Sequence, residues 1–155
     1  MPTGDTSTVK VGWLNLRLPG VALGPSTITY QLIPGSGATF GLTGPSVGPA
    51  KSFSTLPAIL RLNRSGYFDA SNGLTYAYAA KLKYQPGVVY TVRMVLDPTA
   101  RTYNAFVRPA GGIEVQVARN FAFRRNTKAG LFTHLALNAV TGTFKVYNTT
   151  YISRD

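Results

Sequence analysis

The sequence of 155 residues contains no cysteine, a single histidine and only five acidic residues. Without cysteine, the chain has no disulfide framework, no thiolate zinc site and no cysteine nucleophile. No apolar run approaches the length of a membrane-spanning helix. The first residues, MPTGDTST, lack the charged and then apolar regions of a secretory signal peptide. The sequence therefore indicates either a cytosolic protein or a mature or excised domain.

The scarcity of acidic residues argues against a hydrolase. Glycoside hydrolysis usually needs two carboxylates that flank one bond. We expect Asp69 and Asp97 to accept backbone hydrogen bonds in turns, and Glu114 is the only acid on an expected strand. No expected strand carries two acids at alternate positions, and the remaining two, Asp5 and Asp155, lie near the termini.

Other catalytic and metal sites also lack the residues that they need. A Ser-His-Asp triad would require His134, the single histidine, but no G-x-S-x-G motif accompanies it. We interpret His134 as a structural or surface residue. One histidine and scattered acids form no metal-ligand cluster, so we expect no metal and no cofactor. The segment DASNG (69–73) has oxygen ligands of the kind that calcium prefers but too few charges, and a turn is the simpler interpretation.

Basic residues are abundant: 16 Lys and Arg against five acids give a formal net charge of +11. A charge of this size keeps a protein soluble and attracts polyanions. Candidate partners are acidic polysaccharide, nucleic acid or an anionic surface. The alternative is a solvated basic surface with no partner.

The pattern of the chain predicts an all-β fold. Short runs of Val, Thr, Tyr, Phe and Leu are separated by Gly and Pro, and a helical period is almost absent. Many short strands at near-regular spacing favour a single antiparallel two-sheet β-sandwich, or jelly roll, spanning residues 1–155. We expect residues 1–7 to be flexible and the Gly/Pro-rich segment 34–52 to form a long loop. The expected strands are 8–18, 26–33, 38–42, 56–63, 66–70, 74–82, 88–96, 101–108, 113–119, 131–138 and 143–152.

The stretch YTVRMVLDPTARTYNAFVRP (90–109) predicts a β-hairpin whose strands alternate between two faces. One face carries the apolar residues Tyr90, Val92, Met94 and Leu96, followed on the return strand by Tyr103, Ala105 and Val107. The other face carries Arg93, and on the return strand Thr102, Asn104, Phe106 and Arg108. The segment DPTA (97–100) is expected to form the turn. With the next strand, the hairpin makes a meander that has one apolar face and one mixed polar face.

Several segments together resemble a known family. They are the strand LRLN, the turn FDASNG, the strand Y-x-P-G-x-x-Y-x-V-R-M-V-L-D, and the pieces RTYNAFV, NFAFRR and V-x-N, within residues 56–150. This pattern resembles the concanavalin A-like jelly-roll domains of secreted bacterial polysaccharide-active proteins. The resemblance implies a two-sheet sandwich, an extracellular location, and use as a carbohydrate-binding module that accompanies a catalytic domain in a parent polypeptide.

We predict a non-catalytic carbohydrate-binding module that favours acidic polysaccharide. Sugar sites combine aromatic rings with planar hydrogen-bonding side chains, and anionic sugars add Arg or Lys. The polar meander face and the segment YAYAAKLKY supply such residues. The candidate ligand-binding residues are Tyr76, Tyr78, Lys81, Arg93, Asn104, Phe106, Arg108 and Gln116.

Four further residues are not counted as ligands. Arg61 and Arg124 belong to the fold pattern of the resembling family. Arg101 flanks the turn, where we expect solvent around it. Trp13, the single Trp, suits the core as well as it suits a sugar platform.

Three alternative functions stay open. A polysaccharide lyase needs Arg to neutralise a uronate and Tyr or His to take a proton, and these residue types are present. A nucleic-acid binder would also use basic and aromatic residues, although only FRRNTK (123–128) is clustered and no known motif is present. A structural or adhesive jelly-roll protein is the third.

Overall fold

The chain folds as two antiparallel β-sheets packed face to face. The computed structural model describes residues 6–23, 25–36, 39–129 and 131–153. Its strands are β1 (Thr6–Val9), β2 (Gly12–Leu23), β3 (Ser26–Pro34), β4 (Phe40–Ser46), β5 (Leu60–Leu62), β6 (Phe68–Asn72), β7 (Thr75–Ala77), β8 (Tyr90–Asp97), β9 (Thr102–Pro109), β10 (Val115–Ala122), β11 (Leu131–Thr141) and β12 (Phe144–Ser153). A 3-10 turn, η1 (Phe53–Thr55), precedes β5. None of the described segments forms a helix long and apolar enough to span a membrane.

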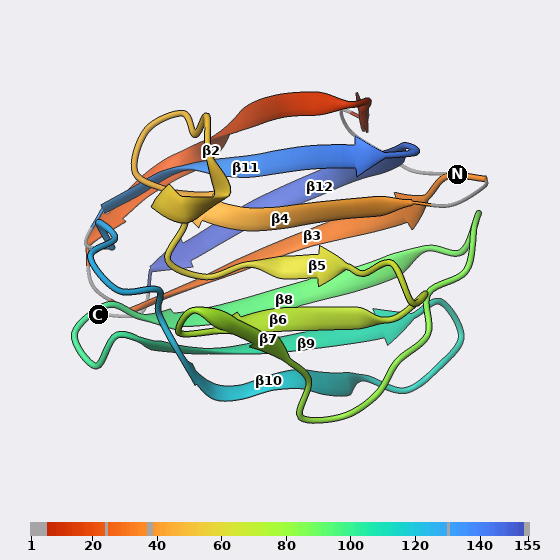
Figure 1. Cartoon of the computed structure of the whole chain (residues 1–155). Helices are drawn as coiled ribbons and strands as arrows, with labels where there is room; N and C mark the ends of the chain where they lie inside the picture. Colours follow the sequence, from red (N-terminus) through yellow and green to blue (C-terminus); the bar gives the residue numbers. More distant parts are fainter. Residues whose placement is uncertain (1–5, 24, 37–38, 130, 154–155) are drawn as a thin grey trace.

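Each sheet has six strands. Sheet A has the order β1-β12-β3-β8-β9-β10, and sheet B has the order β2-β11-β4-β5-β6-β7. Figure 1 shows sheet B in front of sheet A, with η1 and the loop around it lying on the outer side of sheet B. The expected all-β sandwich is therefore confirmed.

Alternation along the strands builds the core between the sheets. Every second residue of β3 and β8 is buried and the residues between them are partly exposed, because side chains of a strand point to opposite faces in turn. The expected hairpin is confirmed: β8 pairs with β9 from Tyr90↔Pro109 to Asp97↔Thr102. Its apolar face is buried in the core, and its polar face is turned to solvent.

Two buried tyrosines tie the sheets together. The Tyr30 hydroxyl of sheet A hydrogen-bonds the Thr43 hydroxyl of sheet B. The Tyr103 hydroxyl of sheet A donates to the Ser71 carbonyl oxygen of sheet B at 2.5 Å. Burial raises the pKa of both phenols, so both stay protonated and able to donate.

The segment 34–52 is not the long loop that its composition predicts. Residues 40–46 form β4, a central strand of sheet B that lies between β11 and β5. Its glycines are required for close packing rather than for turns. A Cβ at Gly41 would lie 2.8 Å from the Asn138 carbonyl oxygen, and one at Gly44 would overlap the Ala58 carbonyl oxygen.

Four other expectations about the strands were wrong. The run 8–18 is not one strand, because it breaks before Gly12 (φ 118) into β1 of sheet A and β2 of sheet B. Thr6 and Ser7, expected to be flexible, pair with β12, whereas residues 1–5 lie outside the described residues. The expected strands 56–63 and 74–82 are reduced to Leu60–Leu62 and Thr75–Ala77.

Candidate functional site

The structure divides the predicted ligand-binding residues between two opposite faces of the sandwich. Arg93, Asn104, Phe106, Arg108 and Gln116 belong to β8, β9 and β10, on the outer face of sheet A. Tyr76 belongs to β7 of sheet B, and Tyr78 and Lys81 follow it in the chain. The two groups therefore cannot form one continuous binding face.

Four of the five residues on sheet A are engaged by one another or by Glu114, whereas Arg108 is exposed and has no ion pair within the described part of the chain. Arg93 makes an ion pair with Glu114 at 2.8 Å, and its guanidinium lies 4.1 Å from the centre of the Phe106 ring. The Gln116 amide donates to the Asn104 side-chain oxygen at 3.0 Å. Because Glu114 neutralises Arg93, this face offers an anion less charge than its sequence suggests.

The group on sheet B has a different centre, Arg61 of β5. Its Nε and Nη2 donate to the two carboxylate oxygens of Asp69 at 2.8 and 2.7 Å, a bidentate pair across β5 and β6. The Asn63 amide also donates to Asp69, at 3.0 Å. The guanidinium carbon of Arg61 lies 3.7 Å from the centre of the Tyr76 ring, close enough for stacking. Asp69 thus holds the Arg61 guanidinium over the Tyr76 ring.

Two more guanidinium groups continue this arrangement along the face. Phe40 of β4 has Arg61 at 5.4 Å and Arg64 at 4.2 Å from its ring centre. Beyond Tyr76, Arg124 lies 5.4 Å from the ring centre of Phe53 in η1. We call this set the Arg61 row; it consists of Arg64, Phe40, Arg61, Asp69, Tyr76, Arg124 and Phe53.

The row carries excess positive charge. Within the described part of the chain, the ion pairs are Arg61–Asp69 and Arg93–Glu114, so Arg64 and Arg124 have no carboxylate partner. The buried Nε of Arg124 also has no hydrogen-bond acceptor among the described residues. An anionic group would therefore find two unneutralised guanidinium groups on this face.

Burial raises the pKa of the Tyr76 hydroxyl, and the nearby positive charges of Arg61 and Arg124 act in the opposite direction. The phenol is therefore protonated at neutral pH and can donate a hydrogen bond. A base that takes a proton from a uronate needs a lowered pKa, so this environment does not prepare Tyr76 for lyase chemistry.

The remaining two residues predicted in this segment follow β7 in the chain. The Lys81 ammonium group sits 4.4 Å from the centre of the Tyr67 ring, and the Tyr67 backbone N–H donates to the Asn63 side chain. The Tyr78 side chain is 43% exposed. Lys81 thus places a cation over the Tyr67 ring, and Tyr78 presents an exposed ring after β7.

A second, smaller hydrophobic cluster covers part of the outer face of sheet B. It consists of Leu42, Ala50, Leu56, Ile59 and Ala136, with Trp13 and Tyr76 packed against it. Trp13 is therefore part of a local core on the outer face, half-buried rather than an open platform. This cluster fixes the loop that carries Phe53.

Two sequence interpretations of single residues are corrected by these contacts, and a third is confirmed. Asp69 lies in a strand and accepts hydrogen bonds from Arg61 and Asn63 side chains, not from a turn backbone. Arg101 is half-buried, not solvated, and donates to the carbonyl oxygens of Thr127 and Arg124 at 3.1 and 2.8 Å. By contrast, Asp97 does accept a backbone hydrogen bond in its turn, from Ala100.

Sequence reasoning missed six of the seven residues of the row: Arg61, Asp69, Arg124, Arg64, Phe40 and Phe53. Arg61 and Arg124 were assigned to the fold pattern, and the ion pair of Arg61 does hold two strands together. The available signal was the spacing of Arg61 and Asp69 on either side of a short turn in the strand pair LRLN-RSGY-FDAS. Groups of three or more potential metal-binding side chains are absent from the residues that the structure describes.

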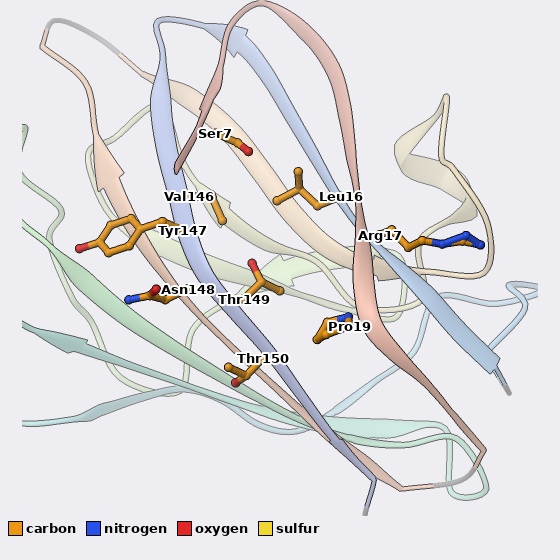
Figure 2. A pocket seen from close by; sticks show the side chains of 9 residues that line it. All are labelled: Ser7, Leu16, Arg17, Pro19, Val146, Tyr147, Asn148, Thr149 and Thr150. Atoms are coloured by element: carbon orange, nitrogen blue, oxygen red, sulfur yellow. The ribbon is translucent and has the colours of Figure 1, made fainter. Parts of the chain in front are cut away.

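Another hollow in the described surface lies between β2 and β12, with a volume of about 510 Å³. Figure 2 shows Leu16 and Thr149 in the space between these strands, whereas the Arg17 side chain points away from it. The buried Thr149 hydroxyl has no hydrogen-bond partner in the described structure. Because Arg17, the one basic residue in the lining, points away from the hollow, this hollow is poorly suited to an anionic ligand.

No protein-family model matches the sequence, and no curated protein matches it. Solved structures do match in fold. The chain is similar to a sialidase with a TM-score of 0.64 at 16% identity, over 97% of this chain and 15% of the sialidase. It is also similar to a GH131 β-glucanase catalytic domain from Podospora anserina (TM-score 0.59, 11% identity, 86% of this chain, 60% of that domain). Arcelin-5, a lectin-like defense protein from Phaseolus vulgaris, matches with a TM-score of 0.54 at 8% identity, over 94% of this chain and 91% of arcelin-5.

These similarities define the class of fold. The chain is a concanavalin-like jelly-roll sandwich, which confirms the resemblance of its sequence pattern. It shares this fold with carbohydrate-active and lectin-like proteins. It spans 15% of the sialidase and 60% of the glucanase domain. At these identities the similarity establishes the architecture, and function has to be argued from the site.

Proposed function

We propose that this protein is a carbohydrate-binding module that binds acidic polysaccharide over the outer face of sheet B. The observation that carries the proposal is the Arg61 row, in which guanidinium and aromatic groups alternate across β4, β5 and β7. The similarity in fold to a sialidase and to a lectin-like protein supports a carbohydrate ligand.

The chemistry of the row suits a charged glycan. Aromatic rings offer an apolar surface, and the Tyr76 hydroxyl and the free N–H groups of Arg61 offer donors to sugar hydroxyls. Arg64 and Arg124 lack carboxylate partners and can fork onto the carboxylate of a uronic acid. Lys81 adds charge at the edge of the same surface.

The same residues support a non-catalytic role. Asp69, the acid within the row, has both carboxylate oxygens engaged by Arg61. It is therefore not available as a general acid or as a nucleophile in a retaining or inverting mechanism. We further propose that the chain acts as an extracellular module of a larger polysaccharide-active protein, as its coverage of the sialidase suggests.

Affinity electrophoresis and calorimetry against pectin, alginate and neutral glucans test this proposal. We expect binding to the acidic polymers and weak binding to the neutral ones. Tyr76→Ala and Arg61→Lys should each weaken binding about tenfold, because they remove the stacked ring or the planar fork. Arg93→Lys and Phe106→Ala are matched controls, since Arg93 has the same kind of ion pair and ring contact on the opposite face.

The controls separate the outcomes. Loss of binding only in the Arg93 and Phe106 variants would move the site to sheet A, where five of the predicted residues lie. Equal binding to neutral glucans would refute the preference for acidic polymers. Growth of absorbance near 235 nm on incubation with a uronate polymer, lost in Tyr76→Phe, would show a lyase instead.

A further inference from the structure

The last three residues of the basic cluster FRRNTK (123–128) line a pocket beside the Arg61 row. A hollow of about 450 Å³ opens between this segment and the loop before β5. Its lining includes Lys51, Ser52, Ser54, Thr127 and Lys128. The lining thus contains two lysines and several hydroxyl groups, and no acidic residue. The pocket is therefore an electropositive hollow, in which the hydroxyl groups of Ser46, Thr55 and Thr127 already donate to backbone carbonyl oxygens.

Lys51 projects from a fixed backbone. The preceding residue, Ala50, is buried and makes two hydrogen bonds to the Asn15 side chain, at 3.0 and 2.8 Å. Nearby, the Gly48 backbone N–H donates to the Thr133 hydroxyl at 2.8 Å. The loop is thus held on the outer face of sheet B rather than free in solvent.

Lys128 also projects from a fixed backbone. The preceding residue, Thr127, is buried, and Arg101 donates to its carbonyl oxygen at 3.1 Å and to its hydroxyl at 3.2 Å. Arg101 adopts a left-handed conformation (φ 56), which is unfavourable for a residue with a side chain. The same arginine donates to the Arg124 carbonyl oxygen at 2.8 Å, so it braces both ends of the segment. The backbone that carries each lysine is thus held before any ligand binds, which lowers the entropic cost of ordering these loops on binding.

The hydroxyl groups leave a donor for an anion. The Ser52 hydroxyl accepts from the Ser54 backbone N–H, and the two serine hydroxyls lie 2.8 Å apart. Whichever serine donates to the other, one hydroxyl hydrogen stays free. Two ammonium groups and a hydroxyl can each rotate to donate in different directions, which suits the oxygens of a tetrahedral oxyanion. A planar carboxylate is matched better by the planar, forked donors of an arginine.

The pocket borders the Arg61 row. Phe53 lies between Ser52 and Ser54 in the chain, and its ring contacts Arg124, which precedes Asn126 and Lys128. A polymer bound along the row can therefore place a side group in the pocket.

We propose that this pocket is a sulfate subsite, so that the preferred ligand is a sulfated acidic polysaccharide. This inference rests on the proposed function. The row takes the sugar rings and carboxylates, and Lys51 and Lys128 take a sulfate ester on the same chain.

Calorimetry with a sulfated polysaccharide, its desulfated form and a single-stranded oligonucleotide tests the subsite. The test variant is Lys51→Gln with Lys128→Gln. The matched control is Lys10→Gln with Lys145→Gln, which removes the same charge from two other exposed lysines. We expect the test variant to bind the sulfated polymer about tenfold more weakly and the desulfated polymer unchanged, since charge-assisted hydrogen bonds are lost only where sulfate is present. The control variant should change the affinities for the sulfated and the desulfated polymer only slightly and by about the same factor.

The outcomes distinguish the two proposals. If wild type binds both polymers equally, or if test and control variants behave alike, the sulfate subsite is wrong while the carbohydrate-binding role stands. If neither polymer binds, the proposed function itself fails. Tighter binding of the oligonucleotide than of the sulfated polymer, with the same dependence on Lys51 and Lys128, would assign the pocket to nucleic-acid phosphate instead.

Discussion

The ion pair at the centre of the site should also stabilise the fold, and Asp69→Asn tests this. Asparagine keeps the shape of aspartate but removes the charge, so the Arg61 guanidinium loses its counter-ion. The Asp69 side chain is 7% exposed and that of Arg61 is 21% exposed. Removing one partner of a fully buried pair costs about 3–5 kcal/mol, and an exposed pair contributes about 0–1 kcal/mol. For this intermediate case we expect a loss of about 2–3 kcal/mol in the free energy of unfolding.

Urea unfolding followed by fluorescence or circular dichroism measures this loss. In a domain of this size it corresponds to a fall in Tm of about 4–12 °C. The variant that replaces both partners, Arg61→Met with Asp69→Leu, should recover part of the stability, because neither charge is then left unpaired. Glu114→Gln is the matched control: the Arg93–Glu114 side chains are 40% and 39% exposed, and we expect a loss below about 1 kcal/mol. If Asp69→Asn costs no more than Glu114→Gln, the pair does not hold β5 to β6 and our account of the site is wrong.

Three further predictions concern the scaffold. Tyr103→Phe should cost about 1–2 kcal/mol in urea unfolding, because the inter-sheet hydrogen bond is lost. Burial raises the pKa of Tyr103 in the folded state, so its contribution to wild-type stability should be complete below pH 10.0, the ordinary pKa of tyrosine, and fall above it. The variant should show a smaller fall in stability over that pH range. Gly44→Ala should cost about 3 kcal/mol, because its Cβ overlaps the Ala58 carbonyl oxygen, and a wild-type Tm would contradict the close packing of β4. Arg101→Ala should lower the free energy of unfolding more than Arg101→Gly does. Both variants lose the hydrogen bonds to Thr127, but glycine adopts the left-handed conformation without strain, which makes a difference of about 1 kcal/mol. Equal Tm values of the two variants would show that the conformation is not strained.

The sequence predicted the architecture well because the architecture depends on local patterns. Alternation in 90–109 correctly identified the buried and exposed residues of β8 and β9. It failed at 34–52, where glycines and prolines are typical of loops. There Gly41 and Gly44 are required by neighbouring strands, a long-range steric demand that composition does not reveal.

The candidate site was predicted only in part. Tyr76 and Lys81 were identified by residue type, but Arg93 was given the same weight although Glu114 neutralises it. Arg61 was set aside because its place in a strand pattern explained it. Whether a guanidinium group is paired, stacked or free depends on which side chains reach it from other strands.

What the sequence alone determined was the inward and outward direction of each strand's side chains, because that direction follows a period of two residues along the chain. What only the tertiary structure decided was which outward-facing residues share a surface. Arg61 and Arg93 both point outward, yet one lies on sheet B and the other on sheet A. The Arg61 row also needs Arg124, which is distant in the chain and is brought to Phe53 by the packing of loops over sheet B. Contacts between distant segments arise from packing, and no local pattern encodes them.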